Sequence, residues 1–192
     1  MERTLIIVKH DGVARGLVGE IVRRFERVGL KLVASKMIQV TKEQAEKHYP
    51  KDRDSLWIAI GNKTIENYTE MGANVKESMG TNDPKEIGHI VREWLHKYLI
   101  QGPVFACIFE GPHAVELVRQ IVGHTLPLKA LPGTIRGDFS YDSSYLANSA
   151  KRPIKNLIHA SGNVEEAEYE VPLWFSADEI VSYKRVEEDI MR

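Results

Sequence analysis

The chain has 192 residues, and its 43% hydrophobic content is enough to bury the core of one generous domain. Its 26 basic and 27 acidic residues give a formal net charge of −1, so overall charge offers no case for nucleic-acid binding. The single cysteine, Cys107, excludes a disulfide framework and a cysteine-based metal site. The first residues carry no signal-peptide pattern and no apolar run reaches transmembrane length, so we expect a cytoplasmic protein without a membrane partner.

Apolar periodicity predicts alternating strands and helices in the first fifty residues. Residues 4–8 are short, β-branched and continuously apolar, which is typical of a buried strand. Apolar residues then recur at helical spacing over 17–28, and Gly29 provides a C-terminal stop. A second strand is predicted over 30–40, and a capping-box pattern opens a short helix over 41–49.

The middle of the chain is predicted to be mostly helical. We expect helices over 55–61 and 64–71, followed by a turn at 79–82. Asp83-Pro84 is a strong helix start, and the apolar face that follows predicts a helix that ends before Gly102-Pro103.

The remaining residues hold two more strands. In chain order we expect a strand at 103–109, a helix at 113–122, loops at 127–137 and 139–155, a strand at 156–161, and helix starts at Asn163 and Ser176. This order contains β-α-β-β-α-β. It predicts an α+β fold, the ferredoxin-like split βαβ sandwich, with a four-stranded antiparallel sheet, helices and a helical insertion.

A histidine near the end of the last predicted strand is a candidate nucleophile. His159 is followed closely by Ser161, and Glu170 lies on the predicted helix downstream. A base or nucleophile beside a hydroxyl and a carboxylate is a pattern of activated catalytic groups. A solitary histidine is more often a packing or surface residue, so the weight of this pattern depends on the rest of the chain.

Three cations elsewhere in the chain are candidate phosphate ligands. Lys9 ends an apolar strand, where a charged side chain either extends to solvent or meets an anion. Arg119 lies on a predicted helix, where a solvated arginine is the ordinary interpretation. Arg136 stands between Gly133 and Gly137, and a guanidinium binds phosphate oxygens in pairs. Together these cations could neutralise a polyphosphate if the fold gathers them.

Several other phosphate and metal motifs are absent from the sequence. There is no Walker A glycine loop and no protein-kinase HRD or DFG segment. The histidines form no HExxH pattern, and His89 and His96 are seven positions apart on one predicted helix, so no zinc site is expected.

These residues together resemble the nucleoside diphosphate kinase family. The similar segments follow the family order: 2–19, 103–111, 119–125, 132–139 and 156–175. The Pro-Gly-Thr-Ile-Arg-Gly-Asp run that starts at Pro132 and the Asn-x-x-His-x-Ser signature that starts at Asn156 are specific in combination.

The resemblance implies a fold, a reaction and partners. It implies the ferredoxin-like core and a Mg²⁺-dependent ping-pong reaction, in which a phosphohistidine carries the γ-phosphoryl group from ATP or another nucleoside triphosphate to a nucleoside diphosphate. Mg²⁺ is expected to be held through the nucleotide phosphates, with no metal ligand from the protein. The family forms tetramers and hexamers, so a homo-oligomer is expected.

The resemblance also assigns roles to single residues. His159 matches the histidine that is phosphorylated, Glu170 the carboxylate that orients it, and Ser161 the hydroxyl beside it. Tyr49 matches a tyrosine near that histidine. The residues that match nucleotide ligands are Lys9, Arg119, Thr125, Arg136 and Asn156.

The chain departs from the family at three single positions. His10 stands where the family has proline, Ala160 where it has glycine, and Gly162 where it has aspartate. None of the three matches a nucleophile or a phosphate ligand, so we expect them to tune activity rather than to abolish it.

We also expect two insertions in a single domain of residues 1–192, one within 50–101 and one within 140–155. The first interrupts the helices that hold the base-stacking aromatic ring. Counting forward from Tyr49 puts this ring at Trp57, whereas counting back from Gly102 leads to Val91. We favour Trp57, because a base clamp needs an aromatic face. The insertion is expected to pack over the nucleotide site or at a subunit contact.

A non-catalytic alternative has the same fold. Insertions that block turnover would leave a nucleotide-sensing or assembly module. A degenerate site should have lost at least one functional residue, and none of the matched histidine, carboxylate and cations is missing.

Overall fold

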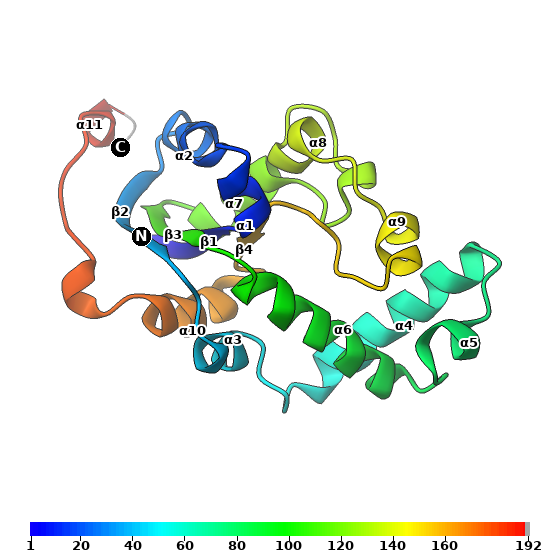
Figure 1. The fold of residues 1–192 in the computed structure, drawn as a ribbon. Helices are drawn as coiled ribbons and strands as arrows, with labels where there is room; N and C mark the ends of the chain where they lie inside the picture. The colour runs from blue at the N-terminus through cyan, green and yellow to red at the C-terminus, as the bar shows by residue number, and fades with distance from the viewer. Residues whose placement is uncertain (191–192) are drawn as a thin grey trace.

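The computed structural model describes residues 1–190 and contains one antiparallel sheet (Figure 1). The strand order is β2-β3-β1-β4, with β1 at Glu2–Val8, β2 at Lys31–Ile38, β3 at Val104–Gly111 and β4 at Ile158–Ala160. Both central strands pair antiparallel with each neighbour, and residues 5–8 of β1 have no exposed surface. The predicted α+β class, the four strands and the ferredoxin-like arrangement are confirmed.

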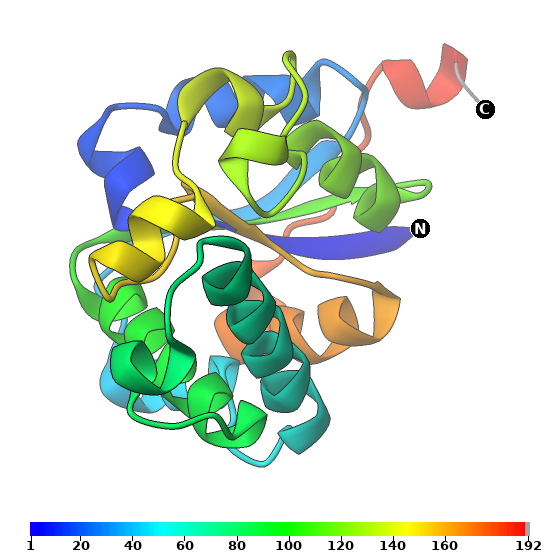
Figure 2. The same cartoon turned by 90° about the vertical axis from the view of Figure 1, so that its right-hand side faces the viewer.

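Helices cover both faces of the sheet (Figure 2). One face packs on α2 (Val18–Glu26) and α7 (Ala114–Val122), and the short helices α1 (His10–Ala14) and α8 (Ile135–Phe139) lie at its end. The other face packs on α3 (Lys42–His48), α10 (Val164–Trp174) and the last turns of α6 (Pro84–Ile100). None of the helices within residues 1–190 combines the length and the apolar character that a membrane span requires.

The helical middle of the chain differs from the prediction of two short helices. A single helix, α4 (Asp54–Glu70), replaces them, followed by α5 (Val75–Met79) and α6. Gly61 does not break α4, because it lies where α4 crosses α6. A Cβ on Gly61 would stand 1.8 Å from the Pro84 carbonyl oxygen, and one on Gly88 would stand 2.0 Å from the Trp57 carbonyl oxygen. The two glycines therefore allow the backbones to approach closely.

The segment 139–155, predicted as a loop, contains the short helix α9 (Ser144–Ser149). This helix has no clear apolar period, and it is fixed by polar contacts instead. The Ser143 hydroxyl accepts a hydrogen bond from the Leu146 N–H at the helix start, and Arg152 binds both carboxylate oxygens of buried Asp142 at 2.5 and 3.0 Å. The helix predicted from Ser176 is only a 3₁₀ turn at Ala177–Glu179, called η2; a second such turn, η1, spans Pro127–Lys129.

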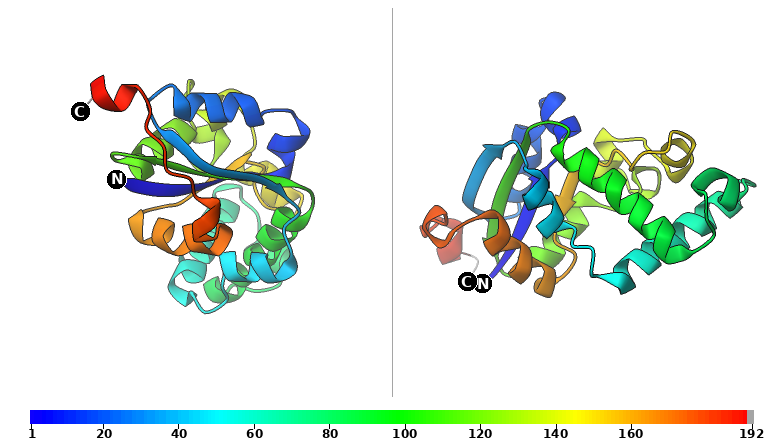
Figure 3. Two further views of the ribbon diagram at one scale, coloured as in Figure 1. Left: turned by 90° about the vertical axis from the view of Figure 1, so that its left-hand side faces the viewer. Right: turned by 60° about the horizontal axis from the view of Figure 1, so that its bottom comes forward.

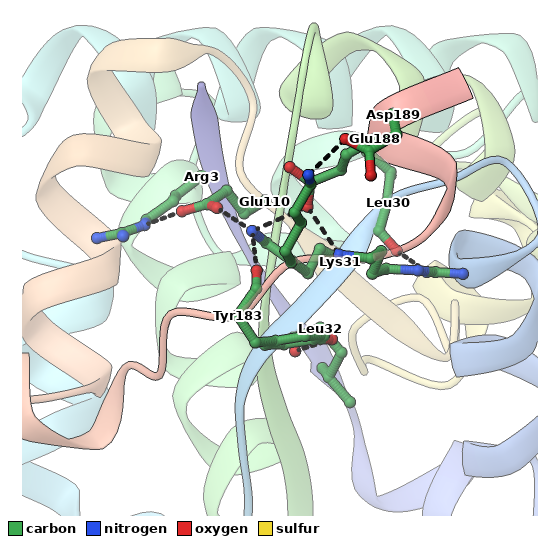
Figure 4. Close-up of polar contacts among 10 residues, drawn as sticks. Arg3, Leu30, Lys31, Leu32, Glu110, Tyr183, Glu188 and Asp189 are labelled. Carbon is green, nitrogen blue, oxygen red and sulfur yellow. Dashed lines mark hydrogen bonds and ion pairs between the residues drawn. The ribbon is translucent and has the colours of Figure 1, made fainter. Parts of the chain in front are cut away.

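The C-terminal segment crosses the outer side of β2 and ends in α11 (Glu187–Ile190), as Figure 3 shows. The Val181 N–H donates to the Val33 carbonyl at 2.9 Å. Lys31 donates to the Tyr183 carbonyl at 2.8 Å and lies 3.0 Å from a Glu110 carboxylate oxygen (Figure 4). Because β2 is at the edge of the sheet, this segment covers backbone groups that would otherwise be available to another strand.

The glycine contact between α4 and α6 leads to a stability prediction. Gly88→Ala should lower the free energy of unfolding by about 3 kcal/mol, because the new methyl group forces two backbones apart. The matched control is Gly19→Ala in α2, where a Cβ meets nothing within 4 Å. That variant should gain about 0.5–1 kcal/mol from the better helix propensity of alanine. Urea unfolding of both variants measures the difference, and equal stabilities would contradict the close crossing.

Candidate active site

The centre of the site is a histidine held by a buried carboxylate. β4 presents His159 and α10 presents Glu170, with His159 Nε2 2.9 and 3.0 Å from the two carboxylate oxygens. Ser161 Oγ donates to the same carboxylate at 2.6 Å and accepts from the Leu5 N–H at 3.2 Å. A carboxylate only accepts hydrogen bonds, so Nε2 carries the proton and Nδ1 keeps its lone pair.

The Glu170 carboxylate is charged despite its burial. Burial alone raises the pKa of Glu170, but the neighbouring His159, followed by His48 and the Ser161 hydroxyl, outweighs burial and lowers the pKa to about 2. The carboxylate therefore remains an acceptor for the His159 N–H at neutral pH.

A second histidine, which the sequence reasoning missed, lies against the first. His48, at the end of α3, has an imidazole ring 4.6 Å from the His159 ring, at an interplanar angle of 81°. Its Nδ1 accepts the Trp174 indole N–H at 3.3 Å and lies 3.7 Å from Glu170. Burial, and then the neighbouring His159, lowers the pKa of His48 to about 3, so this ring is neutral. His48 lies beside His159 because α3 packs on α10, and no motif in the sequence indicates this contact.

These three side chains are the one candidate metal group among the described residues. The donor atoms of His48, His159 and Glu170 lie within 4.8 Å of one another. The Glu170 oxygens already accept from His159 and Ser161, and His48 Nδ1 accepts from Trp174. We interpret the group as a hydrogen-bonded support for His159 rather than as a metal centre.

A cavity of about 180 Å³ opens beside His159. It gathers all but one of the sequence-predicted nucleotide ligands from five separate parts of the chain. The predicted residues that line it are Lys9, Tyr49, Arg119, Thr125, Arg136, Asn156 and His159. The lining contains three cationic side chains and, within residues 1–190, no carboxylate. The charge of this cavity suits an anion.

Lys9 and Asn156 form a polar pair on the cavity wall. The Lys9 ammonium donates to Asn156 Oδ1 at 2.7 Å, and Asn156 Nδ2 donates to the Thr125 carbonyl at 3.0 Å. Burial, and then the charge of Arg136, lowers the pKa of Lys9 to about 7, whereas Asp11 acts in the opposite direction. A bound phosphate would favour the charged ammonium by adding negative charge.

The two arginines play different structural parts. Arg136 on α8 is buried and donates to three backbone carbonyls, those of Ile158 at 2.7 Å, Gly123 at 3.0 Å and Asn156 at 3.2 Å. Burial, followed by the charge of Arg119, lowers the pKa of Arg136 to about 10, so it remains a cation. Arg119 is exposed on α7. Arg136 therefore also braces the loop and strand around the site.

A larger cavity of about 400 Å³ adjoins the first one, and the two share Lys9, Leu95, Thr125 and Asn156. Its other walls come from α4, α6 and the α9 segment, and include Ile60, Val91, Trp94, Asn148 and Pro153. Both regions expected as insertions therefore help to enclose this space.

The expectation that Trp57 stacks on a base is corrected by its position. Trp57 has no exposed surface, and its indole N–H donates to the Pro50 carbonyl at 2.9 Å. It lines neither cavity, because its ring packs between Tyr49 and His89, with ring centroids 6.4 and 6.5 Å away. Val91, the alternative reached by counting backwards, does line the larger cavity, with the aromatic Trp94 beside it.

Comparison with known proteins identifies the family. The family model described as nucleoside diphosphate kinase matches residues 2–67 and 88–180. The chain belongs to the nucleoside diphosphate kinase family. A nucleoside diphosphate kinase from Pyrobaculum aerophilum is 46% identical over 181 residues, which are 94% of this chain and 98% of that protein. One from Borreliella burgdorferi is 40% identical over 188 residues, 98% of this chain and 95% of that protein.

Solved structures of the family have the same fold. The Pyrobaculum aerophilum NDP kinase structure matches with a TM-score of 0.92 at 44% identity, over 94% of this chain and 99% of that chain. A transition state mimic of the Borrelia burgdorferi enzyme, with bound vanadate and ADP, matches with a TM-score of 0.77 at 41% identity, over 97% of this chain and 94% of that chain.

The three departures from the nucleoside diphosphate kinase pattern have defined positions. His10 Nδ1 lies 3.0 Å from the Tyr98 carbonyl oxygen, and Ala160 is buried on β4. The Gly162 N–H donates to the Glu166 carboxylate at 2.8 Å, and a Cβ on Gly162 would meet that carboxylate at 2.6 Å. The Glu166 carboxylate therefore occupies the space next to the Gly162 Cα.

Proposed function

We propose that the chain acts through a phosphohistidine at His159, by ping-pong transfer of the γ-phosphoryl group from ATP or another nucleoside triphosphate to a nucleoside diphosphate. The observation that carries this proposal is the pairing of His159 Nε2 with Glu170, at 2.9 Å, on the wall of a cavity that also holds three cationic side chains. The chain is a phosphotransferase of the nucleoside diphosphate kinase family, and nucleotides are its substrates.

The proposed chemistry needs two displacements at phosphorus. The lone pair of His159 Nδ1 forms a bond to the γ-phosphorus while the bond from phosphorus to the β,γ-bridging oxygen breaks, and the diphosphate leaves. An oxygen of the second diphosphate then attacks the phosphohistidine, and the electron pair returns to Nδ1. Glu170 and Ser161 keep the ring oriented during both steps.

Charge neutralisation is the proposed role of the other side chains. Lys9, Arg119 and Arg136 face the transferring phosphates, and Thr125 and Asn156 contact phosphate and sugar hydroxyls. Tyr49 lies beside His48 and the cavity; burial raises the pKa of Tyr49, so its hydroxyl remains protonated. The divalent cation is proposed to be Mg²⁺. The carboxylate-free lining fits an ion that the nucleotide phosphates hold, and the ion supplies further neutralisation.

The larger cavity is the proposed base site, and Trp94 is the proposed aromatic contact. Trp94 is half-buried on α6 and lines this cavity one turn from Val91. An aromatic face accepts every base, because each base has a π-face.

The organisation of the protein is proposed in the same way. The family model skips residues 68–87, which fall within the first expected insertion, and this supports a single domain with an insertion in 50–101. The second insertion, within 140–155, stays a prediction, because the match of the family model runs through this segment. A homo-oligomer, tetramer or hexamer, and a cytoplasmic location stay predictions.

A non-catalytic nucleotide-sensing or assembly module is the second candidate. The geometry at His159 disfavours it, because a sensor needs no carboxylate on the far nitrogen of a histidine that faces the phosphate cavity.

The nucleophile is tested by removing His159. His159→Ala should abolish the acid-labile phosphoprotein that forms from γ-labelled ATP with Mg²⁺, and with it turnover to a diphosphate acceptor. The control is His113→Asn, because His113 is exposed outside the phosphate cavity and has a positive φ of 52° that asparagine tolerates. Label retained in the alanine variant would contradict the mechanism, and a parent that never becomes labelled would favour the sensing module.

The base contact is tested by a pair of tryptophan variants. Trp94→Leu should weaken binding of purine and pyrimidine nucleotides alike, by about 1–3 kcal/mol for a lost stack. Trp57→Phe should change the unfolding midpoint and leave nucleotide affinity near that of the parent, because Trp57 is fully buried outside both cavities. Titration with ADP and CDP measures both effects. If Trp57→Phe weakened nucleotide binding and Trp94→Leu did not, Trp57 would be the base-stacking residue.

A further inference from the structure

A buried aromatic ring lies beside the active-site lysine. Tyr98, on the last turns of α6, is 3% exposed, and its ring centroid is 5.0 Å from the Lys9 ammonium nitrogen. The other close partner of that ammonium is Asn156 Oδ1, at 2.7 Å. No carboxylate within residues 1–190 forms an ion pair with Lys9, so this buried charge is held by a ring face and an amide oxygen.

The contact of Tyr98 with the site is made by its ring rather than by its hydroxyl. The hydroxyl lies next to the Asp11 carboxylate, and both Tyr98 Oη and Asp11 Oδ1 are buried. Burial, followed by the charge of Asp11 and a side-chain hydrogen bond with it, raises the pKa of Tyr98, so the hydroxyl is neutral. Phenylalanine would keep the ring and remove only this hydroxyl, so it separates the ring contact with Lys9 from the hydroxyl contact with Asp11.

The departure at His10 fixes this ring in place. The His10 and Tyr98 rings meet edge to face, with centroids 4.7 Å apart and an interplanar angle of 83°. His10 Nδ1 also lies 3.0 Å from the Tyr98 carbonyl oxygen, within donor distance. A proline at position 10 would have no aromatic ring to pack against Tyr98 and no side-chain N–H to donate. His10 therefore ties the end of α6 to the start of α1, directly after Lys9.

We propose that Tyr98 is a positioning residue of the active site, whose ring holds the Lys9 ammonium beside Asn156, where it meets the nucleotide. This inference rests on the proposed role of Lys9 as a nucleotide ligand. The ring favours the charged form of Lys9 through its negative face. Arg136 opposes that form and Asp11 favours it, whereas the neutral His48 adds no charge.

The direct test measures Lys9 itself, without nucleotide. Lysine side chains labelled with ¹³C are titrated by NMR in the parent, Tyr98→Phe and Tyr98→Leu, and the Lys9 signal is identified by its loss in Lys9→Met. We expect a lower pKa for Lys9 in Tyr98→Leu and the parental pKa in Tyr98→Phe. Tyr98→Met is a second non-aromatic variant if the leucine variant does not fold. An unchanged Lys9 pKa in a folded non-aromatic variant overturns the proposal.

The functional test separates positioning from folding. Tyr98→Leu should lower kcat/KM about tenfold near neutral pH, with a larger loss at higher pH, and Tyr98→Phe should restore it. In a Lys9→Met background, Tyr98→Leu should cause little further loss. An equal loss in both backgrounds, or a phenylalanine variant as impaired as the leucine variant, overturns the proposal. Failure of the parent to form a phosphoenzyme would instead show that the proposed function fails.

Discussion

The contact between Glu170 and His159 is the interaction on which the site depends. A histidine can present either ring nitrogen, and the carboxylate decides which one by accepting the proton of Nε2. The contact requires β4 and α10 to meet at a fixed distance, and Ser161 joins them by bonding both Glu170 and the backbone of β1. The helix that supplies the carboxylate also packs on the sheet core, so the orientation of the nucleophile is part of the fold.

Burial of the cations around His159 lowers the stability of the folded state. Lys9 and Arg136 are almost fully buried, and burial lowers the pKa of each. Carbonyl and amide oxygens, together with the Tyr98 ring, take the place of ion-pairing carboxylates around them. This arrangement leaves the positive charge available to an incoming polyphosphate, because no carboxylate from residues 1–190 lines the cavity and competes for it.

The sequence predicts what depends on local pattern and on short motifs. The four strands follow from apolar runs, whereas the residues gathered around His159 follow from short motifs that resemble those of the nucleoside diphosphate kinase family. The uninterrupted α4 and the burial of Trp57 do not, because both result from a helix crossing at Gly61 and Gly88, which are far apart in the sequence. His48 is missed for the same reason: its neighbours come from α10. The α9 helix is missed because a cap and the Asp142–Arg152 pair stabilise it in place of an apolar face.

The most direct measurement identifies which nitrogen of His159 carries the phosphoryl group. The phosphoenzyme, formed from ATP and Mg²⁺ and kept at alkaline pH, is digested, and the two phosphohistidine isomers are separated and compared with standards. Because Glu170 lies 2.9 Å from Nε2, the account predicts the Nδ1 isomer. Phosphate on Nε2, or on a residue other than His159, would contradict it.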